Sequence, residues 1–363
     1  MNKNLTRLLA LLLAALACFS LLSGCEQGEG QQTEPSTQPS EPAEDKGYYT
    51  AQDYLENPDL FVPSWADEWQ PPAQMLDFEE KYQQYFTPNG RVMSEAHRGD
   101  RNVLYPENSI EGVLSVVMAG IDIVEIDVHK TKDGVLVAFH DDDLLRTTNL
   151  ALMRLNGQDK DLPQSNNIAD WTLEQLRQLR LTMESGDGTN YVIPTLEEVI
   201  MVCKDRCFVN LDKFWRFDWN LDVVPLIEKQ EAYRTVIVPY KYTRDMGFAT
   251  VSYLLKRLKN ASGYHPAHTS WGQPETISQV AADIIKYDFP KAITVGEYLI
   301  GDAEFYAMIA PYAGSYRLSC CTLVRENDFP EVWAEAADKG INIITSNVNP
   351  YELCKFVAQR HFS

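Results

Sequence analysis

The chain has few histidines, few cysteines and a deficit of basic residues. Of its 363 residues, six are histidine and seven are cysteine, and no spacing of these residues resembles a zinc site. Lys and Arg number 32 against 52 Asp and Glu, which gives a formal net charge of −20. An acidic surface repels nucleic acid and anionic headgroups, so no nucleic-acid partner is expected. An anionic substrate would need local positive charge or a metal.

The apolar run near the N-terminus is short for a membrane-spanning helix, which needs about 20 residues. This run, residues 8–22, follows Lys3 and Arg7, as in a signal peptide. It ends in Leu22-Ser23-Gly24-Cys25, which resembles a bacterial lipobox, in which the cysteine is lipidated. Residues 1–24 are therefore predicted to be a lipoprotein signal peptide. The alternative is an ordinary secretory signal with an incidental Cys25.

Two further segments precede the main domain. Residues 25–47 are mostly Gln, Glu, Pro, Ser and Thr, which cannot bury a core, so they are predicted to form a disordered tether. The folded part is then expected outside the cytoplasm, on the outer face of the cell membrane or in the periplasm, held to the membrane through its N-terminal lipid only. Residues 48–91 are rich in aromatic residues and are predicted to be an N-terminal extension that packs on the main domain. A membrane-contacting segment is the alternative.

From residue 92 to residue 363, short apolar runs alternate with amphipathic stretches. This alternation predicts a parallel sheet with helical crossovers, and eight strands fit a closed α/β barrel, the (β/α)₈ TIM barrel, better than an open sheet. A ninth apolar run near Tyr264 is left over. Helices are expected to begin after the N-cap residues Ser109, Thr172, Thr195 and Asp328. The predicted strands are residues 92–96, 121–128, 136–140, 207–211, 235–239, 292–295, 316–320 and 341–345.

Two carboxylates lie on one face of the second predicted strand. Residues of a strand point alternately to its two faces, so Glu125 and Asp127 point the same way near the strand's end. Two such carboxylates inside a barrel repel each other, and one would be protonated unless a cation lies between them. For an isolated Glu-x-Asp, pairing with a nearby Lys or Arg would be the preferred interpretation.

Two histidines occupy similar positions at strand ends. His97 and His140 each stand where an apolar strand meets a polar loop. With the two carboxylates, they are expected at the C-terminal ends of the first three strands, where barrel enzymes place their catalytic groups. A single histidine in such a place would more often be structural.

Taken together, these motifs resemble the glycerophosphodiester phosphodiesterase family, in its bacterial lipoprotein form. They occur in the family's order and spacing between about residues 92 and 212, and the match beyond is only general. The resemblance implies a TIM barrel of the phospholipase C-like phosphodiesterase type. It rests on HRG at residues 97–99, PENS at 106–109, EIDV at 125–128, TKDG at 131–134, HD at 140–141 and RTT at 146–148.

What the resemblance implies is hydrolysis of small-molecule glycerophosphodiesters to glycerol phosphate and an alcohol, with one Ca²⁺ or Mg²⁺ as cofactor. His97 and His140 would be the general acid/base pair, and Arg98 would hold the phosphate. The resemblance implies three carboxylate ligands for the metal, which are Glu125, Asp127 and Asp212.

The match departs from the family at the third ligand. Asp212 stands where the family has Glu. The lysine that follows, Lys213, is one residue nearer to this ligand than in the family. Lys213 would point away from Asp212 if the strand stayed regular. Lys213 and the rim residue Lys241 are candidate substrate contacts. Glu107 is expected to have a structural role at a turn, since it precedes a helix start.

The chemistry of a phosphodiester supports the same assignment. Hydrolysis needs an electrophile, a base for the nucleophile and an acid for the leaving oxygen, and ligation by carboxylates alone favours calcium or magnesium over zinc. Which histidine is the acid is left open. So is the nucleophile, which is either water or the neighbouring hydroxyl of glycerol. Asp141 could orient His140, although a solvated loop is the preferred interpretation of the acidic run 141–143.

Two other functions compete with this one. A phospholipase or sphingomyelinase D-like enzyme would act on intact lipid, but the chain has no obvious basic patch for docking to a membrane. A non-catalytic binding lipoprotein would keep the barrel without turnover, but both histidines and all three carboxylates are present.

Overall fold

The computed structural model describes residues 46–101, 103–213, 222–237, 292–294, 317–322 and 327–363, with short pieces between 303 and 315. Four sequence predictions lie outside the described residues: the signal peptide with Cys25, almost all of the tether, the apolar run near Tyr264, and Lys241. In the part of the chain that is described, no helix is long and apolar enough to cross a membrane.

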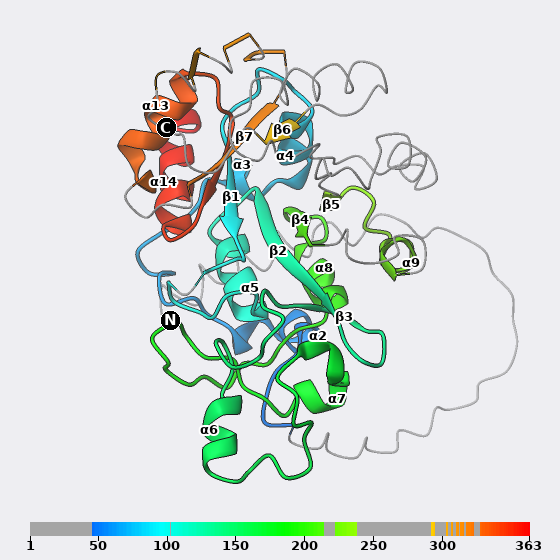
Figure 1. Ribbon diagram of the computed structural model, residues 1–363. Helices are drawn as coiled ribbons and strands as arrows, with labels where there is room; N and C mark the ends of the chain where they lie inside the picture. The colour runs from blue at the N-terminus through cyan, green and yellow to red at the C-terminus, as the bar shows by residue number, and fades with distance from the viewer. Residues whose placement is uncertain are drawn as a thin grey trace, which may run out of the picture. The chain divides into compact units, whose positions relative to one another are not determined.

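The described strands form a parallel sheet in which the first strand pairs with the last. The order is β5-β4-β2-β1-β8-β7-β6, so β1 lies between β2 and β8. Figure 1 shows β1, β2 and β4 as neighbours. First and last strands are neighbours in a (β/α)₈ barrel, so the pairing of β1 with β8 confirms the predicted fold, of which seven parallel strands lie in the described residues. The strands are β1 (Met93–His97), β2 (Ile123–Lys130), β4 (Phe208–Asp212), β5 (Val236–Ile237), β6 (Ala292–Thr294), β7 (Arg317–Thr322) and β8 (Ile343–Ser346).

The third predicted strand is not a barrel strand. β3 (Leu136–Ala138) pairs antiparallel with the outer end of β2, with Ala138 opposite Val128. Only residues 131–135 connect the two strands, and Gly134 takes a φ of +86° in this turn. A parallel connection needs a dozen residues or more, so this short link permits only a hairpin. The prediction of a third barrel strand at residues 136–140 was therefore wrong.

The hairpin leads into a segment with a hydrophobic core of its own. This second core is distinct from the main cluster between sheet and helices. Its buried side chains come from β3 and from the chain that follows as far as residue 193: Val137, Phe139, Leu144, Leu150, Leu162, Ile168, Trp171, Leu176, Leu179, Leu181 and Ile193.

Three of the four expected helix caps are confirmed. The side chains of Ser109, Thr172 and Thr195 accept hydrogen bonds from the first turns of α5, α7 and α8. The described helices are α2 (Ala51–Glu56), η2 (Pro58–Leu60), α3 (Ala73–Leu76), α4 (Phe78–Tyr85), α5 (Ile110–Met118), α6 (Leu150–Leu155), η3 (Ile168–Asp170), α7 (Leu173–Leu176), α8 (Leu196–Cys203), α9 (Val224–Lys229), α13 (Pro330–Asp338) and α14 (Pro350–His361).

Asp328, the fourth expected cap, does not cap α13. This helix begins at Pro330 without a side-chain cap. The Asp328 carboxylate is buried and accepts hydrogen bonds from Ser346 Oγ at 2.9 Å and from the backbone N–H groups of Asn347 and Val348 at 2.9 and 2.7 Å. The expected cap was wrong because this carboxylate instead fixes the loop that follows β8.

The barrel interior changes from apolar to polar along the strands. At the N-terminal ends, Met93, Ile123, Phe208 and Ile343 form a buried layer, which Phe78 and Tyr85 of α4 cover. One step further along the strands, Glu95 accepts hydrogen bonds from Asn210 Nδ2 at 2.7 Å and from the Thr345 hydroxyl. The polar groups therefore gather toward the C-terminal ends of the strands.

The aromatic residues that precede the barrel contact α5. Tyr54 donates to Glu111 Oε1 at 2.5 Å, Trp65 Nε1 to Ser115 Oγ at 2.9 Å, and Trp69 Nε1 to Ala119 O at 3.0 Å. Burial raises the pKa of Glu111 from its usual 4.5 to about 7. The carboxyl group that Tyr54 contacts therefore keeps its proton well above pH 4.5 and loses it only around neutral pH.

This shift predicts a pH-dependent effect of Glu111→Gln on stability. Between pH 4.5 and 7 the unfolded chain releases the Glu111 proton while the folded chain keeps it, so wild-type stability falls as pH rises. Glutamine retains an acceptor for Tyr54 and does not ionise. We expect equal stabilities near pH 4 and an advantage for the variant of at most about 3 kcal/mol above pH 7. Urea denaturation across this range measures it, and parallel pH profiles would contradict it.

Candidate active site

The ends of three neighbouring strands bring the predicted ligands and one histidine together. In the register of the sheet, His97 at the end of β1 lies opposite Glu125 of β2. Asp127, further along β2, lies opposite Asp212 at the end of β4. Parallel strands present their C-terminal ends at one rim of a barrel, so all four residues lie at the same end.

Glu125, Asp127 and Asp212 form a compact cluster of acidic groups. Each offers a carboxylate oxygen, and these oxygens lie within 4.8 Å of one another. Glu125 and Asp127 are buried, and burial together with repulsion from Asp127 and Asp212 raises the pKa of Glu125 well above its usual value. A hard divalent cation prefers such oxygen ligands and would remove this repulsion. The donor set therefore fits Ca²⁺ or Mg²⁺.

Two basic residues reach this cluster through left-handed backbone conformations. Arg98 and Lys213, each directly after a strand end, have φ values of 59° and 60°. Arg98 Nε is 3.1 Å from Asp127 Oδ2, and Lys213 Nζ is 3.2 Å from Asp127 Oδ1. Lys213 does not point away from the site as expected, because its left-handed conformation ends the alternation of the strand. Such conformations cost about 1–3 kcal/mol and occur preferentially at functional sites.

His97 is held in one tautomer by Asn347. Asn347 Oδ1 accepts a hydrogen bond from Arg101 Nη1 at 2.9 Å and lies 2.7 Å from His97 Nδ1. Because this oxygen only accepts, His97 Nδ1 carries the hydrogen and Nε2 keeps a lone pair. Nε2 lies 3.9 Å from Glu125 Oε2. Burial and the nearby charge of Arg98 lower the pKa of His97 to about 3, so its imidazole is neutral at pH 7.

His140 has a carboxylate partner instead. Its Nδ1 lies 2.5 Å from Asp141 Oδ1, and its Nε2 lies 4.0 Å from Asp127 Oδ1. Hydrogen bonds from Arg146 and His140 hold the pKa of Asp141 below its usual value, against the effect of burial. Asp141 therefore orients His140, so the solvated-loop interpretation was wrong for this residue, whereas Asp142 and Asp143 are exposed as it predicts. His140 follows β3 and reaches the site from the hairpin rather than from a barrel strand.

Glu107 belongs to the site rather than to a turn alone. Its carboxylate is 3% exposed and contacts Arg98 at 3.1 Å and Arg146 at 2.5 Å. Asn108, the next residue, has a φ of 58° and exchanges two 3.2 Å hydrogen bonds with Asp127. Glu107 lies outside the acidic cluster, in keeping with the expected structural role rather than ligation, but its partners are arginines of the site and not only groups of the turn. The sequence signal for a role of Glu107 in the site was its place in the PENS motif.

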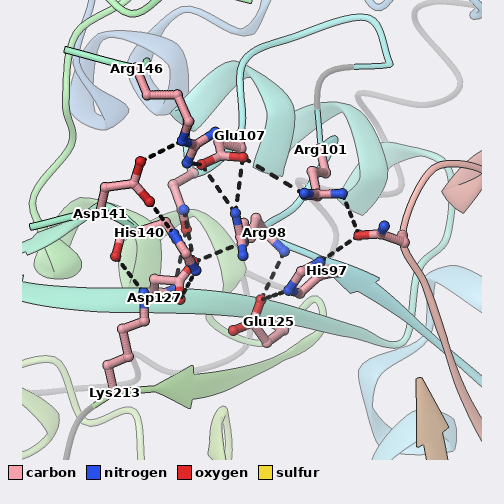
Figure 2. Close-up of polar contacts among 12 residues, drawn as sticks. His97, Arg98, Arg101, Glu107, Glu125, Asp127, His140, Asp141, Arg146 and Lys213 are labelled. Carbon is pink, nitrogen blue, oxygen red and sulfur yellow. Dashed lines mark hydrogen bonds and ion pairs between the residues drawn. The ribbon is translucent and has the colours of Figure 1, made fainter. Parts of the chain in front are cut away.

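Sequence reasoning also missed the roles of three residues. Arg101 and Asn347 carried no signal of their own, because they lie in loops far apart in the sequence and meet only through the neighbouring ends of β1 and β8. Arg146 stood out only as part of the RTT motif. Figure 2 shows Arg101 beside His97 and Arg146 beside Asp141.

Comparison with known proteins agrees with this geometry. Residues 97–264 match the model of the Glycerophosphoryl diester phosphodiesterase family. A glycerophosphodiester phosphodiesterase of Caldanaerobacter subterraneus subsp. tengcongensis is 38% identical over 120 residues, which are 32% of this chain and 43% of that protein. Mouse glycerophosphodiester phosphodiesterase 1 is 33% identical over 126 residues, a third of each chain. The match thus spans less than half the length of these relatives.

Solved structures share the fold over more of the chain. A glycerophosphoryl diester phosphodiesterase from Parabacteroides distasonis superimposes with a TM-score of 0.60 at 24% identity, over 80% of this chain and 94% of that one. A putative one from Silicibacter pomeroyi gives a TM-score of 0.56 at 16% identity, over 78% and 98%. Residues 97–264 therefore resemble the glycerophosphoryl diester phosphodiesterase family in sequence, and the solved structures show that the chain has the same fold.

Proposed function

We propose that the chain hydrolyses glycerophosphodiesters to glycerol phosphate and an alcohol, with Ca²⁺ or Mg²⁺ held by Glu125, Asp127 and Asp212. The observation that carries this proposal is that two histidines from different elements face one carboxylate cluster. His97 Nε2 is 3.9 Å from Glu125, and His140 Nε2 is 4.0 Å from Asp127. A phosphoryl group bound at the cluster would lie within reach of both imidazoles.

The balance of charge in the site supports a metal requirement. The site has four side-chain cations and five carboxylates. Without a metal its net charge is −1 if every carboxylate is ionised and zero if Glu125, whose pKa is raised, keeps its proton; with a divalent cation and all five carboxylates ionised it is +1. A phosphodiester carries one negative charge, which only the metal-bound state attracts. The bound cation would polarise a phosphoryl oxygen and stabilise the charge that develops on it. The groups counted are Arg98, Arg101, Arg146, Lys213, Glu107, Glu125, Asp127, Asp141 and Asp212.

The two histidines have partners suited to opposite roles. His97 is neutral, and its Nε2 lone pair can take a proton from the nucleophile. His140 is paired with the Asp141 carboxylate, which orients the ring so that its Nε2 faces the cluster, where it can donate a proton to the leaving alcohol oxygen. Arg98 and Lys213, both beside Asp127, would hold the phosphoryl oxygens. These contacts support His97 as base and His140 as acid.

We also propose that the protein is exported and anchored by a lipid on Cys25. The support is in the sequence alone: a basic start, a short apolar run and the Leu-Ser-Gly-Cys ending. The anchor would keep the barrel near a membrane surface, where glycerophosphodiesters are released from lipids. Radiolabelled fatty acid should enter the wild-type chain but not Cys25→Ser.

Metal binding predicts a gain in thermal stability. Ca²⁺ or Mg²⁺ at 100 times its Kd should stabilise the folded chain by about 2.7 kcal/mol, because the ion binds the folded state and not the unfolded one. The bound ion would also remove the repulsion that raises the pKa of Glu125. Calorimetry with EDTA and with added cation measures the change in Tm. Asp212→Asn should reduce the gain, while Asp338→Asn, on α13, serves as the control. An equal gain in both variants would place the cation elsewhere.

Removal of either imidazole predicts a loss of turnover without loss of the fold. His97→Ala and His140→Ala should each lower kcat by about 10² to 10⁴, the range of general acid/base catalysis. The double variant should lose far less than the product of the two, since the residues act as a unit. Circular dichroism checks folding. Near-normal kcat in either folded variant would exclude the two-histidine mechanism.

The reaction itself is tested by release of glycerol phosphate. Glycerophosphocholine and glycerophosphoethanolamine are incubated with the chain in EDTA and then with Ca²⁺ or Mg²⁺, and we expect turnover only with the cation. Phospholipid vesicles form a parallel assay. Headgroup release from vesicles without glycerophosphodiester turnover would assign the site to intact lipid instead, and inactivity in every assay would favour a binding protein.

A further inference from the structure

Glu107 is linked to His97 through two intermediate side chains (Figure 2). Glu107 Oε2 lies 3.8 Å from Arg101 Nε, and Arg101 Nη1 donates to Asn347 Oδ1 at 2.9 Å. The same oxygen lies 2.7 Å from His97 Nδ1. Asn347 Oδ1 therefore accepts from both Arg101 and His97, which couples the position of Arg101 to the tautomer of His97.

Glu107 is linked to His140 in the same number of steps. Arg146 Nη2 donates to Glu107 Oε1 at 2.5 Å, and Arg146 Nε donates to the Asp141 carboxylate. Asp141 in turn lies 2.5 Å from His140 Nδ1. Both arms therefore consist of one arginine followed by the hydrogen-bond partner of a histidine, and both begin at the same carboxylate.

A third arginine completes the set around Glu107. Arg98 Nη1 lies 3.1 Å from Glu107 Oε2, and Arg98 Nε lies 3.1 Å from Asp127. Three guanidinium groups thus meet at one carboxylate that is 3% exposed. Hydrogen bonding to Arg146 and the charge of Arg98 hold the pKa of Glu107 below its usual value despite burial, which supports an ionised group.

We propose that Glu107 is the shared positioning residue of the site, which sets the places of His97, His140 and Arg98 together. The inference rests on the proposed hydrolysis of phosphodiesters, because it assigns the two histidines to one reaction. An amide at this position could accept hydrogen bonds but could not neutralise the guanidinium groups. Without the Glu107 carboxylate, the three guanidinium groups would repel one another and move apart. Asn347, Asp141 and Asp127, which contact these arginines, would then shift as well.

Kinetics of two Glu107 variants test the proposal. In the full chain with Ca²⁺ or Mg²⁺, Glu107→Gln should lower kcat by about 10²-fold, the loss expected from misplacing reacting groups by about 1 Å. Glu107→Asp, which keeps the charge, should recover part of this. Glu111→Gln is the matched control, since Glu111 is equally buried but contacts Tyr54 away from the site.

A double variant tests whether Glu107 acts through the histidines. In the His140→Ala background, Glu107→Gln should lower kcat by a much smaller factor than in wild type. Full additivity would overturn the proposal.

A second readout does not depend on turnover. The chain has six histidines, so selective ¹⁵N-histidine labelling gives few imidazole signals. Glu107→Gln should shift the signals of both His97 and His140, Arg101→Lys only that of His97, and Arg146→Lys only that of His140. His361, whose Nε2 accepts from Val92 N–H at the other end of β1, is the internal reference. If neither site signal moves in folded Glu107→Gln, the proposal is wrong.

The two readouts separate this inference from the proposed function. A wild-type chain without glycerophosphodiester turnover, but with the expected imidazole shifts, would keep Glu107 as the positioning residue and remove the reaction. Turnover in wild type together with unchanged kcat and unchanged imidazole signals in Glu107→Gln would keep the reaction and remove the inference.

Discussion

The repulsion between carboxylates at the ends of β2 and β4 is the constraint on which the rest of the site depends. Glu125 and Asp127 are buried one step apart on the same strand face, and Asp212 lies opposite Asp127 in the register. Burying several negative charges in one place is costly unless cations surround them. Arg98 and Lys213 are consequently drawn to Asp127, each through a backbone conformation that an L-residue rarely adopts.

The same electrostatic demand explains why the basic residues of an acidic chain gather in this region. With 52 acidic residues against 32 basic ones, positive charge is scarce, yet four cationic side chains lie within three contacts of Asp127. Each of them forms an ion pair with at least one carboxylate of the site. The acidic surface of the protein thus repels anions in general, while the proposed site at the barrel's rim would accept them once a divalent cation is bound.

The barrel and the residues at the centre of the site could be predicted from the sequence, but the contacts between the loops around them could not. Strand periodicity located β1, β2, β4 and β8, and alternation of faces placed Glu125 and Asp127 together because both properties are local. The hairpin at β3 was misjudged because an apolar run does not reveal its pairing partner. Contacts such as Arg101 with Asn347 join loops almost 250 residues apart, and no local rule relates them. The direction of Lys213 depended on a single backbone angle, which the identity of a lysine does not specify.

The two halves of the site rest on different hydrophobic cores, and this has a consequence for how such an enzyme changes over evolutionary time. His97 belongs to a barrel strand, whereas His140, Asp141 and Arg146 belong to the segment whose buried residues form the second core. Substitutions and insertions in that segment can change the surroundings of His140 while the barrel strands that carry Glu125, Asp127 and Asp212 stay intact. The segment between residues 141 and 193 can therefore vary separately from the carboxylate cluster.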